Sequence, residues 1–126
     1  AMDWYPSGKG SNEILALACA DGSFRLVSKA GRVEKSVAEA HSTAIISIKW
    51  SYEGTLATAG EDGQIKTWSR GGMLRSKLVQ GSKPIYCICW SPDNDSILYC
   101  TDKNLVINPT LPGNKQIQWK AHTLNR

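Results

Sequence analysis

The segment AHSTAIISIKWS at residues 40–51 returns 40 residues later as QGSKPIYCICWS at residues 80–91. Isoleucines occupy matching positions in the two segments, and both segments end on a Trp-Ser pair that begins at Trp50 or Trp90. Self-similarity at a fixed period of about 20–50 residues is typical of repeat architectures. We therefore take a repeat of about 40 residues as the feature that organises the chain.

The same period continues on both sides of this segment. It relates the pairs Asp21-Gly22 and Asp62-Gly63, the glycines Gly31 and Gly72, and, over two periods, the pairs Ala40-His41 and Ala121-His122. Because Trp4 precedes Trp50 by more than one period, we expect the first unit to carry a longer loop within the Gly- and Ser-containing residues 6–12. The pattern predicts one repeat domain over residues 1–126, with units at 1–39, 40–79 and 80–120 and the start of another at 121–126.

The middle unit shows what each repeat contains. Four short β-rich runs, at residues 44–50, 55–60, 64–69 and 73–79, are separated by turn residues. The Asp62-Gly63 pair predicts a two-residue hairpin turn in which both residues adopt positive φ. No segment carries a 3.6-residue apolar period long enough for a helix. Short antiparallel strands in sets of four, repeated along the chain, predict an all-β fold of the β-propeller type.

Four residues of the middle unit carry a resemblance to a known family. The chain resembles the WD-repeat (WD40) family, whose unit has a Gly-His pair near its start and a Trp-Asp pair at the end of its third strand. Units of that family also join their strands through a buried tetrad of His, Ser or Thr, Asp and Trp. The resemblance implies a structural tetrad of His41, Thr58, Asp62 and Trp68 in this chain.

Other positions depart from the family pattern. Ala40 replaces the first Gly and Ser69 replaces the Asp of the Trp-Asp pair. In the first unit, Leu17 and Val27 occupy the Thr and Trp positions, and in the third unit Gly81 stands where His is expected. We therefore expect an intact tetrad in the middle unit alone.

A narrower resemblance concerns stretches that the repeat pattern does not require. Residues 31–37, 60–66, 72–76 and 118–122 are similar to blades two and three of WD-repeat subunits of the intraflagellar transport B complex. This resemblance implies a structural, non-enzymatic role in cilium assembly, with subunits of that complex as partners and a cytoplasmic and ciliary location. The alternative is a WD-repeat adaptor of another complex, such as a coat or signalling scaffold, that binds peptides on a propeller face.

The residues His41, Thr58 and Asp62 also have the types of a catalytic base, nucleophile and orienting acid. Such a triad needs an exposed nucleophile, an oxyanion hole and a substrate cleft. Thr58 falls inside an alternating strand and Asp62 in a tight turn. The pattern therefore favours a hydrogen-bonded network that satisfies buried polar groups, and we expect no catalytic residues.

The Cys-x-Cys pair of Cys87 and Cys89 raises the question of a metal site. Residues at i and i+2 of a strand share a face, so both sulfurs could reach one ion. Zinc sites usually need two more ligands at matching spacings, and Cys19 and Cys100 are predicted in second strands of different units. We interpret the cysteines as small buried apolar residues and expect no metal and no cofactor.

The tryptophans raise the question of a nucleic-acid interface. Trp50 and Trp90, with Trp4 at the equivalent place, could stack single-stranded bases. Their recurrence at one position of the repeat favours packing between blades instead. The net charge of +4 is mild and the basic residues are scattered, and residues 8–11 (GKGS) lack the spacing of a phosphate-binding loop. We expect no nucleic-acid partner.

The apolar content of 41% with 21% charged residues predicts a globular chain. The longest uncharged apolar run, residues 14–20, is far below the roughly 20 residues of a membrane-spanning helix. The N-terminus lacks a signal-peptide pattern. We therefore expect a soluble chain without membrane insertion, and reduced cysteines.

The number of repeats bears on whether the ring is complete. A propeller closes with about four to eight blades, whereas this length holds about three units of the observed period. We expect a partial propeller whose ring is not closed by this chain, with exposed apolar faces at its ends. The remaining blades would come from a longer chain or a partner, and the chain would be a fragment, a short isoform or a truncated gene model.

Overall fold

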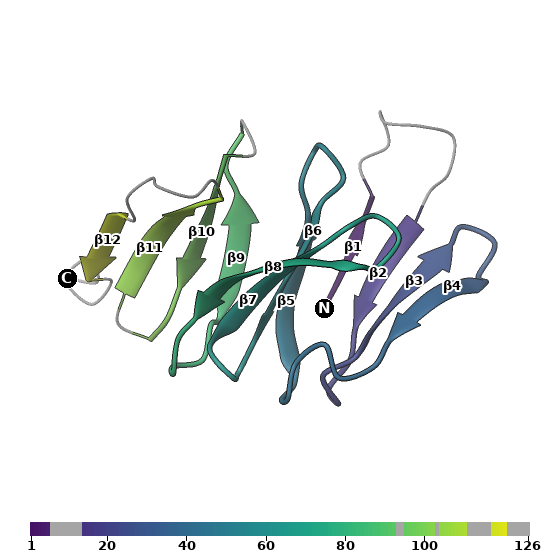
Figure 1. The fold of residues 1–126 in the computed structure, drawn as a ribbon, viewed down its shortest axis with the longest axis horizontal. Coiled ribbons are helices and arrows are strands. Elements are labelled where there is room, and N and C mark those ends of the chain that lie inside the picture. The colour runs from purple at the N-terminus through teal and green to yellow at the C-terminus, as the bar shows by residue number, and fades with distance from the viewer. Residues whose placement is uncertain (6–13, 93–94, 103, 111–116, 121–126) are drawn as a thin grey trace.

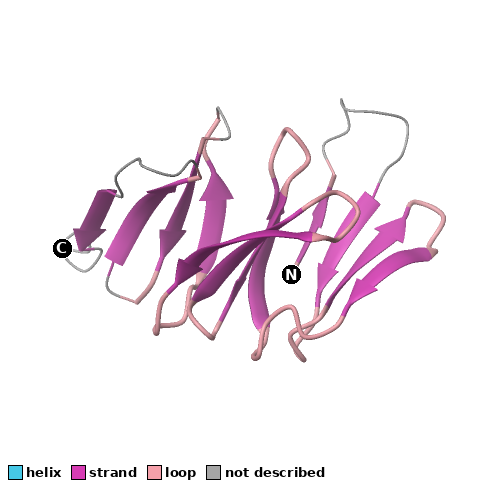
Figure 2. Cartoon of the chain, viewed as in Figure 1, coloured by secondary structure: helices cyan, strands magenta, loops and turns pink. Residues whose placement is uncertain are grey.

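The computed structural model describes residues 1–5, 14–92, 95–102, 104–110 and 117–120. Every regular element among these residues is a β-strand (Figure 2). Two expectations, the long loop of the first unit and the unit that starts at residues 121–126, lie outside the described residues. The phosphate-loop fragment at residues 8–11 lies outside them as well.

The described strands form three antiparallel sheets of four strands each, and in each sheet the strands follow chain order. We call these sheets the first, second and third blade. The first contains β1 (Met2–Trp4), β2 (Ile14–Ala18), β3 (Phe24–Ser28) and β4 (Val33–Val37). The second contains β5 (Ile45–Trp50), β6 (Leu56–Gly60), β7 (Gln64–Trp68) and β8 (Leu74–Gln80). The third contains β9 (Cys87–Trp90), β10 (Ser96–Cys100), β11 (Asn104–Pro109) and β12 (Ile117–Lys120).

The blades stand side by side in chain order, from the first blade in purple and blue to the third in green and yellow (Figure 1). The first strand of the second blade, β5, contacts the first strands of both neighbours, β1 and β9. This arrangement confirms the prediction of an all-β partial propeller with three four-stranded blades that do not close a ring. The four strands predicted in the middle unit lie within one residue of the observed ends.

The Asp-Gly hairpin differs from the prediction of a two-residue turn. Strands β6 and β7 are joined by the three residues 61–63, and the N–H of Gly63 donates to the carbonyl of Gly60 at 3.2 Å. Gly63 has a φ of 80°, whereas Asp62 is not among the residues with positive φ. This is a tight turn followed by a single left-handed glycine, so only one of the two positions needs the freedom that glycine provides.

Successive blades are joined by a backbone hydrogen bond that recurs at both junctions. The N–H of His41 donates to the carbonyl of Gly22 at 3.0 Å, and the N–H of Gly81 donates to the carbonyl of Gly63 at 2.8 Å. Each bond connects the start of a blade to the Asp-Gly turn, or its counterpart, in the blade before it. The backbone therefore places Gly81 at the position that corresponds to His41.

The apolar core is divided between the two interfaces of neighbouring blades. One cluster joins the first and second blades and includes Phe24, Leu26, Trp50, Leu56 and Trp68. The other cluster joins the second and third blades, and its buried members are Ala57, Ala59, Ile65, Ile85, Ile88, Ile97, Tyr99 and Val106. The second blade is covered on both faces, so every residue of β6 is buried even though its side chains alternate.

The tryptophans share a register position but not an environment. Trp4, Trp50 and Trp90 pair with residues at equivalent places in the second strands of their blades. Trp50 is 6% exposed, and its ring meets Tyr5 of the first blade edge-on at 4.9 Å between centroids. Trp90 donates its indole N–H to the carbonyl of Lys49 in the second blade at 3.1 Å.

The expectation that Trp4 packs between blades is wrong for the described chain. Trp4 is 52% exposed. The side chains of Trp50 and Trp90 contact the blade before their own, and none of the residues that the structure describes supplies such a blade before β1. The burial of this tryptophan position therefore depends on a preceding blade, and not on the strand that carries it.

The expectation that the cysteines are buried is also wrong. Cys87 and Cys89 are exposed, and Cys19 and Cys100 are partly buried. Cys19 follows the end of β2 and does not lie within it. On β9, Ile88 points into the core against the second blade, so alternation turns Cys87 and Cys89 to the opposite face.

Candidate functional site

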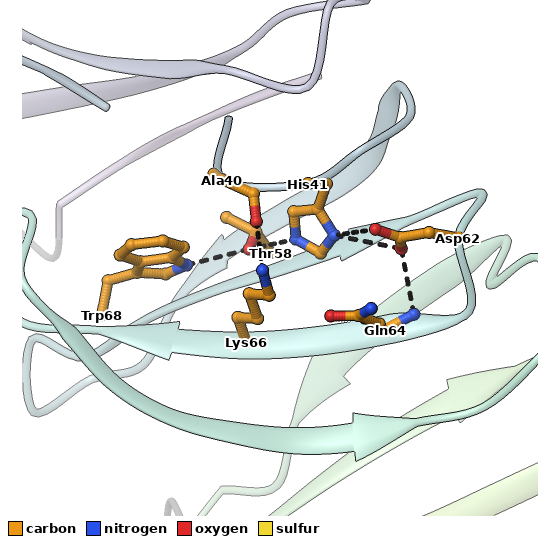
Figure 3. Close-up of polar contacts among 7 residues, drawn as sticks. All are labelled: Ala40, His41, Thr58, Asp62, Gln64, Lys66 and Trp68. Carbon is orange, nitrogen blue, oxygen red and sulfur yellow. Dashed lines mark hydrogen bonds and ion pairs between the residues drawn. The ribbon is translucent and has the colours of Figure 1, made fainter. Parts of the chain in front are cut away.

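The four predicted tetrad residues come from four different places in the second blade. His41 lies just before β5, Thr58 at the centre of β6, Asp62 in the turn after β6, and Trp68 at the end of β7. Thr58 and Trp68 lie on one face of the sheet, because Thr58 pairs with Lys66 and Leu56 pairs with Trp68. The structure brings all four side chains together (Figure 3).

The four side chains form a continuous chain of hydrogen bonds. The Oγ1 of Thr58 lies 2.9 Å from Nε1 of Trp68 and 2.7 Å from Nε2 of His41. The other ring nitrogen of His41, Nδ1, lies 3.0 Å and 3.1 Å from the two carboxylate oxygens of Asp62. The network thus links β6, β7 and the turn between them to the segment that leads into β5, through side chains alone.

The donors and acceptors of this network fix one arrangement of protons. The indole N–H of Trp68 can only donate, so it donates to the Thr58 oxygen. The Thr58 hydroxyl then donates to Nε2 of His41, and the Nδ1–H of His41 donates to the Asp62 carboxylate. A neutral imidazole with its proton on Nδ1 satisfies every polar atom in this chain of contacts.

The environment of His41 favours that neutral form. His41 is 1% exposed. Burial lowers the pKa of His41 below its usual value, and the hydrogen bond and negative charge of Asp62 offset only part of this effect. The imidazole therefore stays uncharged at neutral pH, as the proton arrangement requires.

Two further contacts extend the network beyond the residues found from sequence. The Oδ1 of Asp62 accepts the backbone N–H of Gln64 at 3.1 Å, which closes the turn onto its own strand. The Nζ of Lys66 donates to the carbonyl of Ala40 at 2.6 Å and so holds the segment that leads into β5 (Figure 3). Sequence reasoning missed Lys66, although its place eight residues after Thr58 across a tight hairpin could have indicated it.

The geometry does not fit a catalytic triad. The side chains of His41 and Asp62 border an open depression of about 480 Å³. Thr58 would have to act as the nucleophile, but it is fully buried at 0% exposed. Its oxygen is already engaged by both Trp68 and His41. A hydroxyl enclosed in this way cannot meet a substrate, because attack needs an exposed oxygen beside the reacting carbon.

The first blade lacks this network. Its strand register places Leu17 and Val27 where the second blade has Thr58 and Trp68. Asp21 still closes its own turn, because its Oδ1 accepts the hydroxyl of Ser23 at 2.6 Å and the backbone N–H of Ser23 at 3.0 Å. Both hydrogen bonds lower the pKa of Asp21, and the one from the Ser23 hydroxyl has the larger effect.

The third blade departs at three of the four positions. Gly81 corresponds to His41, and the register of β10 and β11 places Tyr99 and Asn108 where the second blade has Thr58 and Trp68. The hydrogen-bond chain from Trp to Thr to His to Asp is thus found in one of the three described blades.

No group of three or more His, Cys, Asp or Glu side chains within the described residues is placed to hold a metal ion. The described part of the chain has no helix that is long and apolar enough to cross a membrane.

Meandering four-stranded blades with such a network in one of them define a WD-repeat β-propeller protein. The chain belongs to this family, because the family pattern described as "WD domain, G-beta repeat" matches residues 33–69 and 73–107. The match covers β4 of the first blade, the four strands of the second blade, and the third blade as far as β11.

Particular relatives are similar over different shares of the chain. The Intraflagellar transport protein 80 homologs of Mus musculus and Rattus norvegicus are each 49% identical over 127 aligned residues, which cover 96% of this chain. The chain spans only 16% of the length of these relatives. The human F-box-like/WD repeat-containing protein TBL1X is 33% identical over 81 residues, or 63% of this chain and 12% of that protein.

A solved structure shows the same fold. The β-propeller domain of Cps50 (Swd1), given as from Myceliophteria thermophila, superposes with a TM-score of 0.75 at 21% sequence identity. The superposition covers 95% of this chain and 38% of that chain. This similarity concerns the fold alone.

Proposed function

We propose that the chain is a non-enzymatic scaffold module that acts within an intraflagellar transport complex of the B type. The observation that carries this proposal is the 49% identity to Intraflagellar transport protein 80 homologs across 96% of the chain. Because the chain corresponds to 16% of those relatives, the proposal concerns the segment that it matches.

The geometry of the second blade supports a scaffold and not an enzyme. Its conspicuous polar residues, His41, Thr58 and Asp62, satisfy one another inside the blade. Within a fold held in this way, contacts with other proteins would use the exposed rim. The edge strands β4 and β8 expose most of their side chains, and Met73, in the turn before β8, is 71% exposed. These strands combine backbone groups on an open edge with charged side chains, of both signs on β4 and basic on β8, a surface that suits protein contacts.

The partners and the location follow from the same proposal. Other protein subunits would be the partners, and nucleic acid and membrane insertion have no part in the role. The chain would act in the cytoplasm and at the cilium or its basal body. Affinity purification of the tagged full-length gene product tests this directly, and recovery of intraflagellar transport subunits is the expected result.

A second candidate is a WD-repeat adaptor of a different complex that binds peptides on a propeller face. The 33% identity to TBL1X over 81 residues favours it, because that relative belongs to another group of WD-repeat proteins by name. The same purification separates the two candidates. Recovery of coat or signalling subunits without intraflagellar transport subunits would overturn the first proposal and support the second.

A further inference from the structure

Two cysteines face each other across neighbouring strands of the third blade. Cys87 of β9 and Cys100 of β10 are direct partners in the antiparallel register. Their sulfur atoms lie 2.7 Å apart, while both remain free thiols. Directly opposed residues of an antiparallel pair have Cα atoms about 4.5–5.5 Å apart, which falls within the range of about 4.4–6.8 Å that a disulfide needs. The two strands are thus already placed for a bond.

The pair lies on the face of the third blade that is turned away from the second blade. Ile88 and Tyr99, the neighbours of Cys87 and Cys100 along their strands, belong to the core shared with the second blade. Alternation turns the two cysteines to the other face, where Cys87 is exposed and Cys100 is partly buried. Within the described chain, Cys87 is therefore open to a small oxidant.

We propose that Cys87 and Cys100 are a modification site, a dithiol that a small-molecule disulfide such as glutathione disulfide oxidises reversibly to a cross-strand disulfide. Disulfides in reducing compartments are usually transient and sense the redox state. All four cysteines of this chain are free thiols, and the proposed bond would be a reversible disulfide of this transient type.

The reaction balances without any further reagent. The thiolate of Cys87 attacks one sulfur of glutathione disulfide, and the released glutathione thiolate takes up a proton. Cys100 then loses its proton and attacks the sulfur of Cys87 in the mixed disulfide, which releases a second glutathione. Overall, two protein thiols lose two electrons and two protons, and one glutathione disulfide becomes two glutathione molecules.

The order of the two steps follows from the environment of each thiol. Burial raises the pKa of the Cys100 thiol to about 11, and the hydrogen bond with Cys87 is the second largest cause of this rise. Cys100 therefore stays protonated at neutral pH and is the slower of the two to attack an external disulfide. The exposed Cys87 makes the first attack, and Cys100, its partner in the strand register, resolves the mixed disulfide.

The bond would link two strands of a blade that does not have the chain of hydrogen bonds from Trp to Thr to His to Asp. Gly81, Tyr99 and Asn108 stand in the third blade where His41, Thr58 and Trp68 join the strands of the second. A disulfide between β9 and β10 closes a short loop of the chain and lowers the entropy of the unfolded state. Oxidation is expected to raise the stability of this blade, and reduction to reverse the change.

The test treats the 126-residue chain with glutathione disulfide and then blocks the remaining thiols. The variant Cys19→Ser/Cys89→Ser leaves the proposed pair as its only thiols. It is expected to lose both thiols and about 2 Da of mass. Cleavage before Asp95 separates the two cysteines in sequence, so mass spectrometry reports the Cys87–Cys100 link directly. Dithiothreitol is expected to restore both thiols.

Two single variants serve as matched controls. Cys89 lies on the same strand and the same face as Cys87 but opposite Leu98, so Cys89→Ser is expected to leave the link unchanged. Cys100→Ser is expected to trap Cys87 as a stable mixed disulfide with glutathione. Equal glutathione adducts on Cys87, Cys89 and Cys19 in the unsubstituted chain, or links between chains in place of the internal bond, would overturn the proposal.

Discussion

The second and third blades have the same strand order and begin with the same backbone bond to the blade before them, yet their side chains differ. In the second blade, buried hydrogen bonds of His41, Thr58 and Trp68 join β6 and β7 to the segment that leads into β5. In the third, Gly81, Tyr99 and Asn108 occupy these places, and the sheet forms all the same. Backbone pairing and the apolar contacts between blades are therefore enough for a four-stranded blade to form without the chain of hydrogen bonds from Trp to Thr to His to Asp. The polar network adds stability to one blade.

The largest expected effect concerns the joint that both blades share. In Gly63→Ala, a Cβ would lie 2.6 Å from the carbonyl oxygen of Gly81, at a position with a φ of 80°. Overpacking typically costs about 1–3 kcal/mol, and left-handed backbone costs roughly 1–2 kcal/mol more for a residue with a side chain. Chemical denaturation should therefore show a large loss of stability.

The matched control for this change is Gly31→Ala. Gly31 has a φ of 89°, but nothing lies within 4 Å of a Cβ added there. The stability of this variant should fall only by the cost of placing a residue with a side chain in left-handed backbone. Equal losses in the two variants would mean that the contact between the second and third blades contributes little.

The next effect compares Asp62, which belongs to the hydrogen-bonded network of the second blade, with Asp102 in the third blade. Asp62→Ala leaves the buried Nδ1–H of His41 without its acceptor, which costs about 1–3 kcal/mol. Asp102 lies in the corresponding turn of the third blade and is exposed, so Asp102→Ala should change stability by no more than about 0.5 kcal/mol. The free energy of unfolding of both variants checks this contrast, and an equal loss at Asp102 would contradict it.

A smaller effect is expected from the indoles. Trp68→Phe keeps an aromatic ring against Phe24, whose centroid lies 4.9 Å away, but removes the hydrogen bond to Thr58. The expected loss is about 1 kcal/mol. Trp90→Phe removes a bond to the Lys49 carbonyl at an exposed place, and it should cost less. Thermal or chemical denaturation measures both losses. A loss of stability in Trp90→Phe as large as or larger than that in Trp68→Phe would contradict the expected contribution of the buried network.

The pH dependence is the smallest effect. The pKa of His41 is lower in the folded chain than the roughly 6.5 of an unfolded chain. Below that pH the unfolded state binds more protons, so the stability present above about pH 6.5 is lost as the pH falls toward the folded pKa. Denaturation curves between about pH 7.5 and 5.5 measure this slope. His41→Ala should abolish this part of the slope and His122→Asn, which removes the other histidine, should keep it.

Much of the fold could be predicted because the signals are local. Turn residues and β-rich runs at a 40-residue period placed the strands of the second blade within one residue of their observed ends. The tetrad residues could be proposed from the family pattern. Asp62-Gly63 predicted a hairpin but not its length, because an Asp-Gly pair suits several turns and the structure shows left-handed backbone only at Gly63.

What could not be predicted depends on neighbouring blades. The same strand position is buried in Trp50 and exposed in Trp4, because only Trp50 has a described blade in front of it. The exposure of Cys87 likewise depends on which face of the third blade is covered by another blade, and the sequence of β9 alone does not determine this. The contact of Lys66 with the Ala40 carbonyl depends on how the segment before β5 crosses the sheet.

Hydrogen exchange of the backbone amides tests most directly whether the side-chain network stabilises the second blade beyond what all blades share. Under reducing conditions, the amides of β6 and β7 should exchange more slowly than those of β10 and β11. Asp62→Ala should accelerate exchange in β6 and β7 selectively. Exchange in β6 and β7 that Asp62→Ala leaves unchanged, or an equal acceleration in all three blades, would contradict the account.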